Sequence, residues 1–227
     1  MTHFAELSDA ERERITAAVA GAEQRSAGEI VTILTRRSDG YTDIALIWAA
    51  IAAFLALLLL AYAPDFWLGL IDRITGAWAN ERSPRELFAL AGIAAMVMFV
   101  GMLVLQLWRP LKFALVPGPI RSARVRGRAV AAFKIGAERR THGRTGILIY
   151  LSLDERRAEI VADEAIAGQV SPEVWGDAMA AMLAEIRQGR VADGLIAAIE
   201  RVGVVLAEYV PRADNDVNEL PDRLIEV

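Results

Sequence analysis

Two long apolar runs without a charged residue dominate the hydrophobic pattern of this chain. They cover residues 44–63 (IALIWAAIAAFLALLLLAYA) and 87–108 (LFALAGIAAMVMFVGMLVLQLW). A helix rises about 1.5 Å per residue, so each run spans about 30 Å, the thickness of the hydrocarbon core of a bilayer. The first run starts too far along the chain for a signal peptide, and no small-residue cleavage motif follows a short apolar segment. The pattern predicts an integral membrane protein with two transmembrane helices.

The residues before the first run predict one helix and one strand. The helix begins at Ser8, where Glu11 completes a capping-box pattern, and we expect Gly28 to end it. Residues 29–35 (EIVTILT) form a β-branched run that is typical of a strand. One helix and one strand bury too little apolar area to offset the entropy of ordering them, so this segment needs another piece of chain in order to fold.

The residues after the second run supply that piece. Pro110, Pro117 and Pro119 are expected to break up the exit from the membrane. The elements expected beyond them are a basic helix from Ser122 that Gly143 closes, a strand over 146–153 (GILIYLSL), a turn at 154–156, a strand over 157–162 (RAEIVA), a helix from Ser171 to Gly189 and a helix over 191–209 that Pro211 ends.

These elements predict an α/β fold in which helices flank a small mixed sheet, and the domain is discontinuous in sequence. A strand, a helix and a second strand favour a right-handed crossover, so the strand at 29–35 should pair in parallel with the strand at 146–153. The expected parts are residues 1–40 and 111–213, which together form the domain, the transmembrane hairpin at 41–110, and an extended tail at 214–227 that contains Pro221.

Charge predicts how the chain lies in the membrane. The net charge of −4 does not favour nucleic-acid binding, and the absence of cysteine excludes disulfides, thiolate metal sites and cysteine nucleophiles. Basic residues gather before the first span and after the second, whereas acidic residues offset the arginines of the connecting segment 64–86. The positive-inside rule therefore predicts that both termini are cytoplasmic and that the protein resides in the cell inner (plasma) membrane.

The hairpin itself carries few polar groups. Residues 66–78 (FWLGLIDRITGAW) fit either a short helix in the outer interface or a plain loop. Gln106 is the only strongly polar side chain in either run, which argues against a solute pathway. Small residues should let the spans pack on each other, and the same faces could form a homo-oligomer: Ala45, Ala49, Ala53, Ala56, Ala91, Gly92 and Ala95.

An acidic cluster lies at the predicted hairpin and just after it. Its members are Asp154, Glu155, Glu159, Asp163 and Glu164. Ca²⁺ and Mg²⁺ prefer several oxygen ligands, so Asp163, Glu164 and Asp154 are the candidate metal ligands. The alternative for Asp154 and Glu155 is a solvated turn, because acids are common in turns and arginines follow them directly.

The chain shows no complete catalytic set. It has no phosphate-binding glycine loop and no aspartate nucleophile motif of phosphoryl transfer. Its histidines, His3 and His142, lie near the N-terminus and on a turn that ends a helix, which does not favour a Ser-His-Asp triad. The residues alone therefore name no catalytic group.

A basic patch follows the second span. Arg121, Arg124, Arg126 and Arg128 lie on the predicted helix just past the membrane, and Lys134, Arg139 and Arg140 continue the series. Basic residues near the surface gain about 1 kcal/mol each from anionic lipid. The patch is expected to face lipid, although basic residues here could also serve only to set the topology and solvate a helix.

Several segments resemble the TPM domain family, also called the TPM phosphatase family. They are GEIVTIL (28–34), TGILIYLSLDERRAEIVAD (145–163), PEVWGDAM (172–179) and IRQGRVADGLIAAIE (186–200), and the resemblance covers about residues 5–36 and 122–212. It implies an α/β sandwich with a small central sheet. The family includes a thylakoid lumen protein with acid phosphatase activity and an auxiliary subunit of animal acetylcholine receptors, so the fold serves both catalysis and binding. No phosphatase aspartate of the family carries over to a matched position here.

Two hypotheses of function follow. In the first, a cytoplasmic TPM-like domain acts as a binding or assembly module at the membrane surface, with the lipid bilayer and other membrane proteins as partners. In the second, the domain is a metal-assisted phosphatase that acts on phosphate monoesters with Ca²⁺ or Mg²⁺ at Asp163, Glu164 or Asp154. Transport would need polar positions in the membrane that this chain lacks.

Overall fold

A computed structural model describes residues 7–75, 83–136, 145–212 and 222–227. His3, Trp78, Arg139, Arg140, His142, Gly143 and Pro221, which carried sequence predictions, lie outside these ranges. The elements are α1 (Asp9–Glu23), β1 (Glu29–Thr35), α2 (Thr42–Tyr62), α3 (Pro64–Thr75), α4 (Pro84–Leu105), α5 (Arg109–Leu115), α6 (Gly118–Gly136), β2 (Gly146–Ser152), β3 (Arg157–Ala162), α7 (Glu164–Ala167), α8 (Pro172–Ile186), α9 (Val191–Tyr209) and β4 (Ile225–Glu226). They form two compact units, one of residues 1–39 with 118–227 and one of residues 40–117.

The first unit is built on a mixed four-stranded sheet with the order β3-β2-β1-β4. β1 pairs in parallel with β2 over its whole length, from Glu29 opposite Gly146 to Thr35 opposite Ser152. β2 and β3 form an antiparallel hairpin, and β4 adds a short parallel strand to the other side of β1. The predicted fold class and the predicted parallel pair are confirmed.

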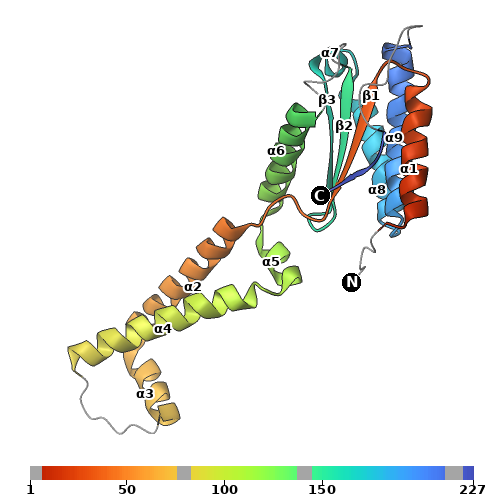
Figure 1. The fold of residues 1–227 in the computed structure, drawn as a ribbon. Coiled ribbons are helices and arrows are strands. Elements are labelled where there is room, and N and C mark those ends of the chain that lie inside the picture. Colours follow the sequence, from red (N-terminus) through yellow and green to blue (C-terminus); the bar gives the residue numbers. More distant parts are fainter. Residues whose placement is uncertain (1–6, 76–82, 137–144, 213–221) are drawn as a thin grey trace. The chain divides into compact units, whose positions relative to one another are not determined.

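Helices cover both faces of this sheet, so β1 and β2 are buried along their entire lengths. Figure 1 shows α1, α8 and α9 on one face and α6 on the other. Alternate residues of each strand reach the two sides: Ile30 and Leu34 join the larger apolar core under α1, α8 and α9, while Val31 and Ile33 pack with α6. This two-sided burial explains why both strands read as continuous apolar runs.

α9 lies at the centre of the larger core, and α1 packs along it. The sequence placed the end of α1 at Gly28, but the helix ends at Glu23. Gly28 instead allows a close approach to α9, because a Cβ there would lie 2.5 Å from Leu206 Cδ2. The predicted helix start is confirmed, since Ser8 and Glu11 form both bonds of the capping box.

The second unit is a helical hairpin in which α2 and α4 pack along each other. Ala45 and Ala49 are buried in α2, as expected for small residues at a helix contact. Gly92 is exposed, and no atom lies within 4 Å of the position that its Cβ would take, so it does not contribute to the packing. Gln106 caps α4 and donates from Nε2 to the Ala45 carbonyl oxygen at 3.1 Å.

Two of the three prolines after α4, Pro110 and Pro119, lie at the starts of helices, although all three were predicted to break up the chain. Pro117 lies between α5 and α6, as predicted. Pro110 lies in the first turn of α5, where its missing N–H costs nothing. α6 begins at Gly118, four residues before the predicted start at Ser122, with Pro119 in its first turn. α7 and β4 were not predicted, because a helix of four residues and a strand of two residues carry no periodic signal.

Candidate functional site

The hairpin of β2 and β3 separates the predicted metal ligands. Its register pairs Ser152 with Arg157 at one end and Ile147 with Ala162 at the other. Asp154 lies in the turn at the first end, and Asp163 follows the strand at the second end. Since a strand rises about 3.3 Å per residue, the two carboxylates are on the order of 20 Å apart. The structure therefore does not bring Asp154 together with Asp163 and Glu164.

Asp163 holds the start of β2. Its side chain is only 5% exposed, and Oδ2 accepts from the Gly146 N–H at 3.2 Å. The backbone bond in the other direction, from Asp163 N–H to the Gly146 carbonyl, measures 3.0 Å. Glu164 is exposed in the first turn of α7. Within the described residues, no group of three or more His, Asp or Glu side chains could hold a metal ion.

Glu155 is buried, whereas the sequence suggested that it lies in a solvated turn. Its side chain is 1% exposed, and it accepts from the Ser38 N–H at 2.8 Å and from the Ser152 hydroxyl. Tyr150 extends the cluster, because its hydroxyl lies 3.2 Å from Ser38 Oγ. These contacts tie the chain beyond β1 to the turn beyond β2. The turn holds Arg156 at a positive φ of 52°. Nothing in the sequence indicated the burial of Glu155, because the Ser38 N–H that it binds lies more than a hundred residues earlier in the chain.

The basic residues of α6 lie on two sides of the helix. Its buried stripe is formed by Val125, Ala129 and Phe133, which pack against the sheet. A helix turns about 100° per residue, which places Arg121, Arg124 and Arg128 on one flank of that stripe and Arg126 on the opposite flank. The predicted patch is therefore divided by the face that docks on the sheet.

The two flanks of α6 have different surroundings. Arg124 pairs with Asp39 at 2.9 Å. Arg121 Nε is buried and has no hydrogen-bond partner within the described part of the chain. On the other flank, burial raises the pKa of the Glu159 carboxyl on β3, and the charge of Arg126 partly offsets that rise. The flank of Arg121, Arg124 and Arg128 is thus the more strongly basic one.

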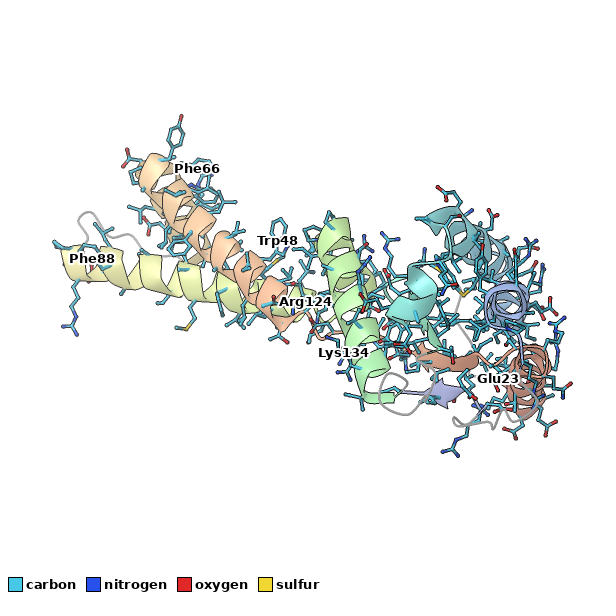
Figure 2. All side chains as sticks on the ribbon, turned by 90° about the horizontal axis from the view of Figure 1, so that it is seen from above. Glu23, Trp48, Phe66, Phe88, Arg124 and Lys134 are labelled. Atoms are coloured by element: carbon cyan, nitrogen blue, oxygen red, sulfur yellow. The ribbon has the colours of Figure 1, made fainter. Side chains whose placement is uncertain are left out.

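A buried carboxyl group that sequence reasoning missed lies at the end of α1. Glu23, labelled in Figure 2, accepts from the Ile30 N–H at 2.7 Å. Burial, together with the charges of Glu29 and Asp222, raises the pKa of Glu23 to about 8, although the hydrogen bond from the Ile30 N–H lowers it in part. The protonated carboxyl also hydrogen-bonds Asp222, which precedes β4. This group fastens the C-terminal segment to the domain, and a lone Glu in a helical pattern carries no sign of that role.

Comparisons with known proteins support the fold. Residues 123–205 match the TPM domain of the TPM phosphatase family. The chain is similar in structure to the BA42 protein from the psychrophilic bacterium Bizionia argentinensis, solved by NMR, with a TM-score of 0.56, 18% identity, and coverage of 100% of this chain and 99% of that chain. No curated protein matches the chain.

Proposed function

We propose that this chain is an integral protein of the inner (plasma) membrane that displays a cytoplasmic TPM-like domain as a binding or assembly module at the membrane surface. The domain is interrupted by the hairpin, which leaves it after Asp39 and returns at Gly118. In this arrangement the bilayer is one partner, and other membrane proteins are the second.

The observation that carries the proposal is the exposure of two long apolar helices. α2 and α4 are 21 and 22 residues long, and their most apolar 18-residue stretches have mean hydropathies of 2.8 and 2.6. A core helix of a water-soluble protein has the same composition, but its side chains are buried. Here large apolar side chains such as Phe54, Leu58 and Phe88 are exposed on the hairpin, and leaving such a surface in water would be costly.

The charges next to the helices support the orientation. Arg36 and Arg37 precede α2, and Arg109 and Lys112 follow α4, all within the first residues beyond the apolar segments. Beyond them, the flank of α6 with Arg121, Arg124 and Arg128 is suited to anionic headgroups.

Binding fits the domain better than catalysis. Within the described residues, the acidic side chains of the hairpin are separated or hydrogen-bonded into the fold. The Ser152 hydroxyl does donate to the Glu155 carboxyl, but both residues are buried, so a substrate cannot reach this pair. Fold likeness does not decide the role, because one fold serves many functions.

Single-cysteine labelling tests insertion and orientation, since the chain has no cysteine of its own. Cysteine would replace the exposed Glu13, Arg85 or Gln188 in the full-length protein, one at a time. In spheroplasts, an impermeant maleimide should label only the Arg85→Cys variant, and permeabilisation should expose the other two. Labelling of Glu13→Cys or Gln188→Cys in intact spheroplasts would overturn the orientation, and recovery of the protein in an alkaline wash would overturn insertion.

The second candidate function is a metal-assisted phosphatase, which the name of the matched family favours. The full-length protein in nanodiscs would be assayed on a generic phosphate monoester with Ca²⁺, with Mg²⁺ and with a chelator. Metal-dependent turnover that Glu164→Gln removes would establish this function in place of the first. Specific co-purification of membrane proteins with an inactive full-length protein would establish the first.

A further inference from the structure

α3 is a separate amphipathic helix that begins where the first apolar helix ends. A proline disfavours helical backbone in the residue before it, and Ala63 accordingly leaves the helical region with φ −134° and ψ 64°. Pro64 itself fits the first turn of a new helix. Only Ala63 separates α2 from α3, and Figure 1 shows that α3 turns away from the direction of α2.

The side chains of α3 divide into an apolar and a polar sector. At about 100° per residue, Phe66, Leu70 and Ile74 fall on one stripe, and Asp65 and Asp72 fall on the other side of the helix. The stripe is not covered by the hairpin: Phe66 is 64% exposed and Ile74 is 77% exposed. Trp67, Leu68 and Ile71 continue the apolar sector and are half-buried.

We infer that α3 lies in the lipid interface of the outer leaflet, with the stripe of Phe66, Leu70 and Ile74 turned toward the acyl chains. This inference rests on the proposed membrane insertion. If α2 crosses the bilayer, its last residue, Tyr62, reaches the outer interface, and the single residue that follows keeps the start of α3 at that depth. The nearest apolar medium for the exposed stripe is then the bilayer that α2 has just crossed.

The charges of α3 specify how it binds. Its charged residues are Asp65, Asp72 and Arg73, so the helix has no basic face that would attract anionic headgroups. Burial of apolar area is therefore the driving force. The docking of α3 should persist in high salt and in uncharged lipid, in contrast to the contact expected of the basic flank of α6.

The test is spin-label accessibility in the full-length protein in nanodiscs of phosphatidylcholine, with and without phosphatidylglycerol. Single cysteines at Phe66, Leu70 and Ile74 would be compared with cysteines at the exposed Asp65 and Gly69 of the same helix. Labels on the stripe should show several-fold higher collision with oxygen than with a water-soluble nickel chelate, and the labels at positions 65 and 69 should show the reverse. Neither high salt nor the change of lipid should alter this pattern.

Labels at Leu58 in α2 and Val97 in α4 separate the inference from the function on which it rests. If these labels are buried in lipid while the stripe of α3 collides freely with the nickel chelate, the inference is wrong and membrane insertion stands. If neither probe reaches the labels of the stripe, α3 is covered by protein, which also overturns the inference. If the labels of α2 and α4 are in water, the proposed membrane insertion is wrong and the inference fails with it.

Discussion

At the scale of single residues, the position of Glu23 makes the domain sensitive to pH. The folded domain keeps this carboxyl protonated up to a pKa of about 8, whereas an unfolded chain releases the proton near 4.5. Between these values the folded state binds more protons than the unfolded state, so the free energy of unfolding falls as pH rises. Each unit of pKa difference corresponds to about 1.4 kcal/mol.

We therefore predict that the unfolding midpoint of the full-length protein decreases from pH 5 to pH 8 in neutral detergent. Glu23→Gln keeps a hydrogen-bonding amide at the site and cannot ionise, so it should remove most of this slope and be the more stable protein at pH 8. Glu13→Gln, on the exposed side of the same helix, is the matched control and should keep the wild-type slope. Equal slopes in wild type and Glu23→Gln would contradict the prediction.

Glu155 is the residue that joins the ends of β1 and β2. Replacing it with alanine leaves the Ser38 N–H and the Ser152 hydroxyl without their acceptor, which should cost about 1–3 kcal/mol of stability. Asp154→Ala changes the neighbouring, more exposed side chain and should stay within about 0.5 kcal/mol of wild type. Denaturant titrations of both variants measure the difference, and similar stabilities would show that the buried cluster contributes little.

At the scale of elements, the contact between α1 and α9 depends on a residue without a side chain. A Cβ at Gly203 would lie 2.7 Å from Ala22 Cβ and 3.3 Å from Ala22 Cα, so the two helices would have to move apart. Gly203→Ala should destabilise the domain by about 1–3 kcal/mol.

The control for this prediction is Gly176→Ala in α8. No atom lies within 4 Å of the Cβ position there, so the substitution should raise stability by up to about 1 kcal/mol through helix propensity. Both variants replace a helical glycine with alanine, and only the surroundings of the two glycines differ. A stabilising Gly203→Ala would therefore show that α1 and α9 are farther apart than described.

The sequence predicted elements with a strong period or a strong cap, and it missed features that depend on tertiary contacts. The capping box at Ser8, the apolar strands and the helix at 191–209 are local signals, and each was placed correctly. The role of Gly28 was misassigned, because its reason is Leu206 of a distant helix. The burial of Glu155 and Glu23 was missed for the same cause, since their partners lie on other elements.

At the scale of the whole molecule, the pairing of β1 with β2 joins two pieces of chain across the whole hairpin. The residues at which the chain leaves and re-enters the domain, Asp39 and Gly118, are close to each other. Asp39 forms an ion pair with Arg124, which lies six residues after Gly118 on α6. Six helical residues span about 9 Å, which a few flexible residues can bridge. The hairpin is thus an insertion whose removal need not strain the sheet.

We predict that residues 1–39 joined by a short Gly/Ser linker to residues 118–227 form a water-soluble, cooperatively unfolding domain. The parallel pair of β1 and β2 should be retained, and amide hydrogen exchange should show Ile30 to Leu34 among the most protected residues, because both faces of the strand are covered.

Residues 118–227 expressed alone should not fold, since β2 would lose its parallel neighbour and α9 its contact with α1. If that fragment folds by itself with a protected β2, then the N-terminal helix and strand are an accessory, and residues 118–227 are a complete domain without them. If the joined domain is unfolded in water, the sheet needs the hairpin or the bilayer for its stability, and the two units cannot be treated as independent.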